Sequence, residues 1–139
     1  MNTTETVASI MSTNIITLNK SDELETAELL FKRHKIRHIP VVNGKVILGM
    51  LSYTDLLRIS FADAVDESET EIETLVYNMF TIDQVMAKNV VTVKSNTTIK
   101  EVAVILAQKE FHALPVVEHG RLVGIVTTTD LINYMLKQF

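Results

Sequence analysis

The 139-residue chain contains no cysteine, only four glycines and no long apolar run. The lack of cysteine excludes disulfides, thiolate zinc sites and thiol catalysis. The glycines form neither a Walker-type loop nor a Gly-x-Gly-x-x-Gly loop, as phosphate-loop and dinucleotide-binding enzymes require. No stretch of about 18 apolar residues could span a membrane. The polar start at residues 2–5 cannot serve as the core of a signal peptide. We therefore expect a cytoplasmic protein without membrane contact.

The charge balance is mildly acidic, with a formal net charge of −4 and a pI near 5.5. Nucleic-acid binding needs a basic surface that neutralises phosphates, so this composition argues against a nucleic-acid partner. Hydrophobic residues make up 47% of the chain and charged residues 22%, which is typical of a folded soluble protein. The length allows one compact domain or two small ones.

The sequence repeats itself at an offset of 75 positions. Residues 10–57 align with residues 85–132 without a gap, and ten of the 48 aligned pairs are identical. The identical pairs are Met11/Met86, Asn14/Asn89, Thr17/Thr92, Pro40/Pro115, Val41/Val116, Val42/Val117, Gly49/Gly124, Thr54/Thr129, Asp55/Asp130 and Leu56/Leu131. Repetition of this kind indicates two copies of one structural unit.

Each repeat begins with a short extended piece, residues 15–18 in the first copy, followed by a helix. Asp22 with Glu25, and Thr98 with Glu101, fit the capping box that marks a helix start. Apolar residues then recur at helical spacing in both copies.

Two β-rich runs follow the helix in each repeat. Residues 39–42 and 46–51 flank Asn43-Gly44, a strong hairpin signal, and residues 114–117 and 122–126 form the second pair. Pro40 and Pro115 are expected to open strands, where a missing N–H is tolerated. A second helix is expected from Asp55 and from Asp130.

The repeating unit is therefore β-α-β-β-α and about 50 residues long. Such a unit is too small to bury an adequate core alone. We predict an α+β fold in which the two repeats pack as a pseudo-twofold pair. The predicted domains are residues 1–60, residues 82–139 and a connecting segment, residues 61–81.

The connecting segment is rich in carboxylates. They are Asp63, Asp66, Glu67, Glu69, Glu71 and Glu73. The sequence leaves two interpretations open, a cation site and a solvated acidic loop leading into a short helix.

Three blocks, in the same order in both repeats, carry a family resemblance. They are Ser9-Ile10-Met11 with Gln84-Val85-Met86, His38-Ile39-Pro40-Val41-Val42 with Ala113-Leu114-Pro115-Val116-Val117, and the closing Gly-x-x-Ser/Thr-x-Thr-Asp. This pattern resembles the CBS domain, named after cystathionine beta-synthase, in the tandem form called a Bateman module. The resemblance covers nearly the whole chain apart from residues 61–80.

The resemblance implies a ligand site at the closing motif. In that family the motif Asp accepts hydrogen bonds from ribose hydroxyls, and the motif Ser or Thr contacts ribose or phosphate. The implied residues are Asp55 and Asp130, supported by Ser52, Thr54, Thr127 and Thr129. The residues alone allow a second interpretation, because Ser, Thr and Asp are also the preferred helix caps.

The resemblance also implies contacts to base and phosphate. Thr17 and Thr92 occupy positions where the family often places a hydroxyl near the base, although threonine is also an ordinary β-former. The two positions before the hydrophobic-Pro pair often meet phosphate in this family. They hold Arg37 and His38 in the first repeat, where Arg37 suits phosphate through its paired donors. In the second repeat the same two positions hold His112 and Ala113. The resemblance also implies that Pro40 and Pro115 contact the ligand.

Metal and catalytic sites find little support. His34 and His38 are four residues apart, but no carboxylate completes a metal site. Nothing resembles a nucleophile with its base and orienting group, so we expect no enzyme and no required cofactor.

The sequence therefore predicts a ligand-sensing regulatory module. An adenosine-containing ligand (AMP, ADP, ATP, a dinucleotide or S-adenosylmethionine) would bind in the cleft between the repeats, and an unidentified effector would read the change in trans. The alternative is an assembly module that binds no small molecule. Apolar side chains on the two closing helices predict a homodimer under either interpretation; they are Leu56, Leu57, Ile59, Leu131, Ile132 and Met135.

Overall fold

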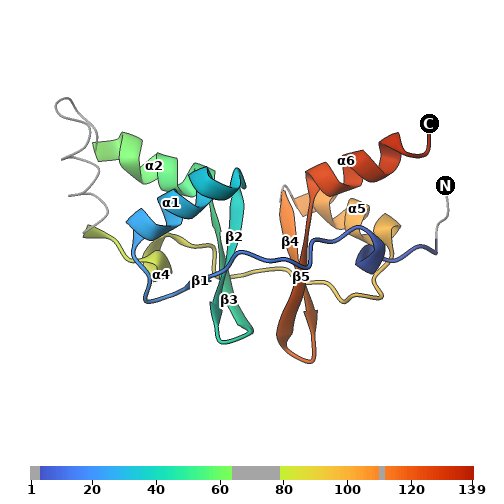
Figure 1. Ribbon diagram of the computed structural model, residues 1–139, viewed down its shortest axis with the longest axis horizontal. Helices are drawn as coiled ribbons and strands as arrows, with labels where there is room; N and C mark the ends of the chain where they lie inside the picture. The colour runs from blue at the N-terminus through green and yellow to red at the C-terminus, as the bar shows by residue number, and fades with distance from the viewer. Residues whose placement is uncertain (1–3, 64–78, 110–111) are drawn as a thin grey trace. The chain divides into compact units, whose positions relative to one another are not determined.

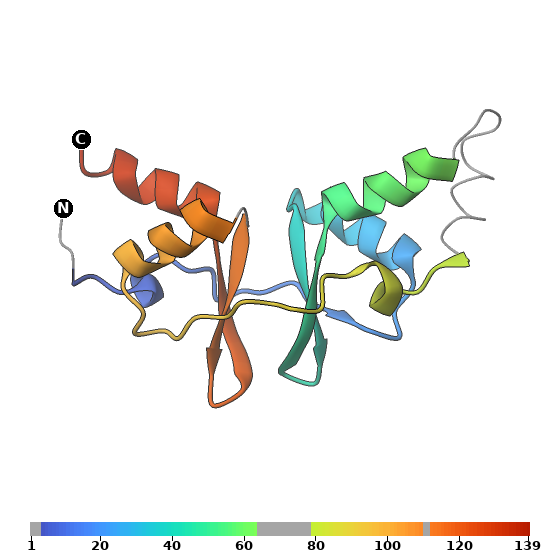
Figure 2. The ribbon, with the colours of Figure 1, turned by 180° about the vertical axis from the view of Figure 1, so that it is seen from behind.

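The computed structural model describes residues 4–63, 79–109 and 112–139, without the side chains of residues 60–63. The carboxylates predicted to form an acidic segment lie outside this description. The described residues divide into two compact units. The repeat-1 unit comprises Ile16–Asn89, and the repeat-2 unit comprises Val90–Phe139 together with the chain up to Ile15. The N-terminal segment thus packs with the second repeat, as Figures 1 and 2 show by its dark blue colour beside the orange and red elements.

The repeat-1 unit follows the predicted order of elements. It contains β1 (Leu18–Asn19), α1 (Leu24–His34), β2 (His38–Asn43), β3 (Val46–Ser52), α2 (Tyr53–Asp63) and α4 (Ile82–Val85). Strand β1 pairs in parallel with β2, and β2 pairs antiparallel with β3. Helices α1 and α2 contact each other.

The repeat-2 unit has the same plan. It contains the 3₁₀ helix η1 (Val7–Ser9), α5 (Ile99–Lys109), β4 (Ala113–Glu118), β5 (Arg121–Thr127) and α6 (Thr128–Leu136). A single parallel bridge between Val93 and Val116 replaces the first strand of the repeat. The unit is α+β, as predicted.

One of the two predicted capping boxes forms. The Thr98 hydroxyl accepts from Glu101 N at 3.1 Å, and the Glu101 carboxylate accepts from Thr98 N at 3.4 Å. The prediction for Asp22 is wrong, because α1 begins one residue later, after Glu23, without a side-chain cap. Asp22 instead accepts from Asn19 N at 2.8 Å and closes a local turn.

The two hairpins have loops of the same length but different turn types. Asn43, predicted to lie in the first loop, is the last residue of β2, and the loop is Gly44-Lys45. Only Gly44 has a positive φ there (64°), which fits a type II′ turn. In the second hairpin both His119 and Gly120 have positive φ (51° and 78°), as a type I′ turn requires.

The two prolines lie within strands and do not open them. Pro115 is the third residue of β4, and its carbonyl accepts from Val93 N at 3.1 Å. Its missing N–H is tolerated because the parallel ladder begins at this carbonyl. Pro40 has the same place in β2.

The motif glycines allow two segments of the chain to cross at close distance. Met50 and Ala87 exchange backbone hydrogen bonds of 3.0 and 2.9 Å, which lays the chain after α4 across β3. A Cβ on Gly49 would lie 2.5 Å from Met86 Sδ and 2.7 Å from the Ala87 carbonyl oxygen. In the repeat-2 unit, Met11 and Ser12 cross β5 at Gly124 in the same way. The methionines and glycines that are identical in the two repeats therefore contact each other: Met86 packs on Gly49, and Met11 packs on Gly124.

Each unit has its own hydrophobic core. The first core is formed by Leu18, Leu24, Ala27, Phe31, Ile39, Val41, Leu51, Leu56, Ile82 and Met86. The second is formed by Val7, Val93, Ile99, Val102, Leu106, Leu114, Val116, Val126, Leu131 and Tyr134. Val7 and Ile82, which come from the segments preceding each repeat, are fully buried. The segment before each repeat therefore completes the core of the other repeat's unit.

Candidate functional site

The closing motif of each repeat lies where a strand turns into a helix. At the start of α2 the Ser52 hydroxyl accepts from Asp55 N at 3.0 Å. At the start of α6 the Thr127 hydroxyl accepts from Asp130 N at 3.2 Å. Thr54 and Thr129 lie exposed in the first turns of the two helices. In each unit a hydroxyl and a carboxylate thus gather at the positive end of a helix.

The two motif carboxylates have different partners. Asp130 accepts from Thr127 N at 2.8 Å and completes a reciprocal capping box. Asp55 forms an ion pair with Arg58, with 3.2 Å between Oδ1 and the guanidinium nitrogen. The Arg58 side chain is 73% exposed, so this pair contributes little to stability. Capping therefore occupies one oxygen of Asp130, whereas the described partner of the Asp55 carboxylate is a solvent-exposed arginine.

The residues before the hydrophobic-Pro pair lie beside these helix starts. The Arg37 carbonyl accepts from Tyr53 N at 2.9 Å, and the His112 carbonyl accepts from Thr128 N at 3.0 Å. His38 is paired with Ser52 across β2 and β3. Opposite residues of an antiparallel pair project from the same face of the sheet, so the side chains of His38 and Ser52 lie on one face. The structure thus brings the predicted phosphate and ribose residues of each repeat to one end of the unit.

The predicted base contacts lie on the other edge of each hairpin. Thr17 is exposed directly before β1, and Thr92 is exposed directly before Val93. The parallel register places Leu18 opposite Val41, and therefore places Thr17 near the buried Pro40. The same relation holds for Thr92 and Pro115.

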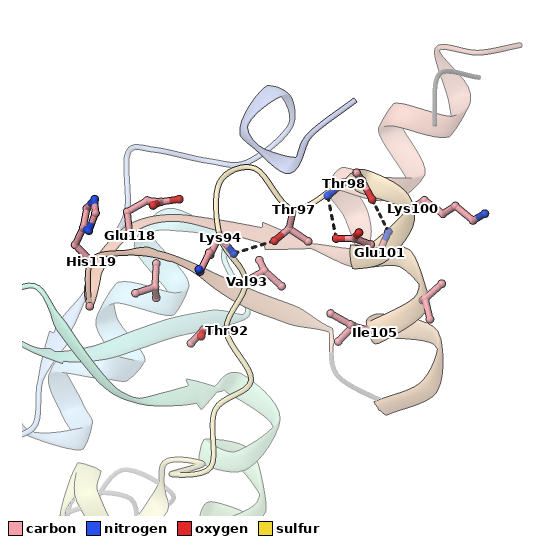
Figure 3. A pocket seen from close by; sticks show the side chains of 13 residues that line it. Thr92, Val93, Lys94, Thr97, Thr98, Lys100, Glu101, Ile105, Glu118 and His119 are labelled. Carbon is pink, nitrogen blue, oxygen red and sulfur yellow. Dashed lines mark hydrogen bonds between the residues drawn. The ribbon is translucent and has the colours of Figure 1, made fainter. Parts of the chain in front are cut away.

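Thr92 is also part of an open groove of about 1250 Å³ in the repeat-2 unit. The lining residues come from the connection before α5, from α5 itself and from the tip of the β4–β5 hairpin (Figure 3). They are Thr92, Val93, Lys94, Thr97, Thr98, Lys100, Glu101, Val104, Ile105, Val117, Glu118, His119 and Gly120. The groove combines an apolar floor with three threonines and both signs of charge, which suits a ligand with an apolar ring and polar substituents.

A hydrogen-bonded pair fixes one wall of the groove. Ser95 donates from its backbone N, at 2.8 Å, and from its hydroxyl to the same oxygen of Glu118. These bonds hold the pKa of the Glu118 carboxyl below its ordinary value. Glu118 therefore stays ionised and ties the connection before α5 to the hairpin.

Sequence reasoning missed the polar groove residues other than Thr92. Lys94 and Glu118 lie in a connection and at a hairpin tip, and neither position is identical in the two repeats. The signal that could have indicated Glu118 is its position in the repeat, because a carboxylate there replaces Asn43 of the first copy.

The described part of the chain contains neither a group of metal ligands nor a helix that could span a membrane. Among residues 4–63, 79–109 and 112–139, no three His, Asp or Glu side chains are grouped as a metal ion would require. Over the same residues, no helix has both the length and the apolar character needed to cross a membrane.

The sequence comparison identifies the repeats. The family model described as the CBS domain matches the chain twice, at residues 7–62 and 82–137. The chain belongs to the CBS domain family. Its relatives include the CBS domain-containing protein YhcV of Bacillus subtilis, which is 28% identical over 133 residues. That match covers 95% of this chain and 87% of the relative.

Solved CBS structures agree with this assignment. The CBS domain pair of protein MJ0100, solved in complex with 5′-methylthioadenosine and S-adenosyl-L-methionine, is 26% identical with a TM-score of 0.78. The match covers 96% of this chain and 98% of that one. CBSX2, solved in complex with AMP, is 24% identical with a TM-score of 0.80, over 96% of this chain and 97% of the other, and shows the same fold.

Proposed function

We propose that this chain is a regulatory module, not an enzyme, that binds an adenosine-containing ligand and signals to an effector in trans. One observation carries the proposal: in both units a motif hydroxyl and carboxylate meet at a helix start, beside the residue that precedes the hydrophobic-Pro strand. The MJ0100 pair, which shares this family and fold, is described as binding two adenosine compounds.

The proposed ligand contacts follow the chemistry of the two clusters. Asp55 and Asp130 accept hydrogen bonds from ribose hydroxyls. Arg37, with His38 or His112, meets phosphate, because a guanidinium grips two phosphate oxygens at once. The base lies on apolar strand residues near Thr17 or Thr92, in the cleft expected between the repeats. Candidate ligands remain AMP, ADP, ATP, a dinucleotide and S-adenosylmethionine.

The first test is a thermal-shift screen with these compounds, followed by calorimetry. A ligand at 100 times its Kd stabilises the folded state by roughly 2.7 kcal/mol, so even a weak site is detectable when the ligand is added at millimolar concentration. No shift and no heat with any of the compounds would contradict the proposal.

Arg37→Ala should weaken AMP binding about 10- to 100-fold, which corresponds to the loss of one or two charge-assisted hydrogen bonds. Adenosine, which has no phosphate, should bind the variant as it binds the wild type. The preference for AMP over adenosine should also fall as salt rises, since salt screens exposed charges. Calorimetry at low and high salt measures all three effects.

Arg33→Ala is the matched control, because Arg33 is an exposed cation in the last turn of α1. If Arg33→Ala weakens AMP as much as Arg37→Ala does, the effect is a general loss of positive charge and the phosphate role of Arg37 is wrong.

A second candidate function is an assembly module without a small-molecule ligand. Two observations favour it: Asp130 already caps its own helix, and α6 exposes a row of apolar side chains. Ile132 and Met135 are about half exposed and Leu136 is 62% exposed. An exposed apolar row of this kind is typical of an interface.

Under either function we expect a homodimer in solution. Sedimentation at tens of micromolar should give twice the 15.6 kDa of the chain. Ile132→Glu should shift the equilibrium towards monomer, because a charge in an apolar interface is costly, whereas Lys137→Glu at the exposed end of α6 should not. A wild type that sediments only as the monomer would contradict the dimer.

A further inference from the structure

The connection at residues 94–98 has one side that lines the groove and a second side that holds the N-terminal segment, residues 4–12. Lys94, Thr97 and Thr98 line the groove (Figure 3). In the same connection, the backbone carbonyls of Ser95 and Thr97 accept hydrogen bonds from the N-terminal segment. Any shift of this connection therefore acts on both the groove and the segment.

Three backbone hydrogen bonds join the segment to residues 95–99, and one of its side chains is buried in the core. Val7 N donates to Thr97 O at 2.8 Å, and Ala8 N donates to Ser95 O at 3.3 Å. Ile99 N donates to Glu5 O at 2.9 Å, where α5 begins. The Val7 side chain has no exposed area and belongs to the core.

Tyr134 on α6 also interacts electrostatically with the N-terminal segment. The Tyr134 hydroxyl is buried, and no described residue forms a hydrogen bond of normal geometry with it. The pKa of Tyr134 is raised, mainly by interaction with the Glu5 carboxylate and to a smaller extent by burial. The N-terminal segment therefore contacts both α5 and α6.

Polar groups of the groove also hold the connection in its present shape. The Thr97 hydroxyl accepts from Lys94 N at 3.0 Å across the turn. Glu118 accepts from Ser95 N and from the Ser95 hydroxyl. A ligand that hydrogen-bonds to Thr97 or Glu118 competes with or reinforces the bonds that set this turn.

The first repeat lacks this link. Ile82 is the counterpart of Val7 and is equally buried. Nevertheless, no backbone hydrogen bond joins residues 79–85 to residues 19–23, all of which the structure describes. In the repeat-1 unit, the chain that follows α4 is bonded to β3 at the crossing of Met50 and Ala87. The double-sided connection is therefore a feature of the repeat-2 unit.

We propose that the N-terminal segment reports occupancy of the groove, so that a bound adenosine compound holds residues 4–12 on the repeat-2 unit. This inference rests on the proposed function. By linkage, a ligand that favours the attached state must bind more weakly when the attachment is weakened.

The direct test is amide hydrogen exchange by NMR on the full chain, with AMP and with S-adenosylmethionine as probes. The amides of Val7, Ala8 and Ile99 make the three attachment bonds. If detachment requires an empty groove, their exchange should slow by about 100-fold at a ligand concentration of 100 times Kd. The amides of Met50 and Ala87, which join β3 to the chain after α4 in the other unit, should slow far less.

The reciprocal test uses a matched pair of truncations. Val7→Ala should lower the affinity for the bound probe on the order of fivefold, whereas Ile82→Ala, a larger truncation in the other core, should leave it unchanged. Both variants are assayed where circular dichroism shows them fully folded. Slowed attachment amides and a selective effect of Val7→Ala support the inference.

Failure of this inference and failure of the proposed function give different results. If a probe binds by calorimetry but the three amides exchange unchanged, or both truncations act alike, the inference is wrong and the proposed function stands. If neither probe nor any other adenosine compound binds, the proposed function is wrong and the inference is overturned with it.

Discussion

Gly49→Ala is expected to lower the free energy of unfolding by about 1–3 kcal/mol, as overpacking of a close contact typically does. The new Cβ would lie 2.5 Å from Met86 Sδ and 2.7 Å from the Ala87 carbonyl oxygen. The methionine can change rotamer, but the carbonyl is backbone and is fixed by its bond from Met50 N. The crossing strand must therefore move, and both bonds between Met50 and Ala87 weaken. Urea unfolding monitored by circular dichroism measures the loss.

Gly124→Ala is the matched variant in the second repeat and should cost less. There the Cβ would meet Met11 Sδ at 2.5 Å, but the nearest backbone atom, the Ser12 carbonyl oxygen, lies at 3.2 Å. A shift of a few tenths of an ångström relieves that contact. A Gly49→Ala protein as stable as the wild type, or less affected than Gly124→Ala, would show that the crossing does not require a residue without a side chain at position 49.

This contact shows how far the internal repeat determines the fold. Self-alignment identified Met11, Met86, Gly49 and Gly124 as repeated positions, and it predicted the order of helices and strands in both copies. It could not show that the segment before one repeat completes the core of the other. That pairing depends on which strand each methionine crosses, and two equivalent copies offer the same apolar pattern to both segments.

Local competition explains the errors at the element boundaries. Asp22 and Glu25 have capping-box spacing, but Asp22 forms a turn with Asn19, so the helix begins after Glu23. Asn43-Gly44 is typical of a type I′ loop, yet the register leaves Asn43 in the strand. In both cases a short-range pattern had two solutions, and neighbouring bonds selected one.

The candidate site was predicted where chemistry and repetition coincide, and missed where they do not. The motif residues at the helix starts stand out because polar side chains recur 75 positions apart. The pair Ser95 and Glu118 is separated by 23 residues and has no counterpart in the first repeat, where Lys20 and Asn43 hold the equivalent positions. Only the folded hairpin brings these two side chains together.

The two motif aspartates should contribute different amounts to the stability of the protein. Asp130 accepts from Thr127 N within a complete capping box, so Asp130→Ala should lower stability by about 0.5–2 kcal/mol. The described partner of the Asp55 carboxylate is the exposed Arg58, and such pairs contribute about 0–1 kcal/mol. Asp55→Ala should therefore destabilise the protein less than Asp130→Ala does.

Ligand affinity separates ribose binding from capping for both residues. If each carboxylate holds ribose hydroxyls, either alanine variant should weaken its site by roughly 1.5–3 kcal/mol, or about 10- to 100-fold, because bonds to a charged acceptor are lost. Thr81→Ala is the control, since it removes the capping box at the start of α4 and touches neither motif carboxylate. Calorimetry with AMP and unfolding in urea should be measured on the same samples. Affinity that falls in both aspartate variants, out of proportion to their different stabilities, supports the ribose role. Unchanged affinity in both, with a loss of stability in Asp130→Ala as in Thr81→Ala, would identify Asp130 as a helix cap and favour the assembly module.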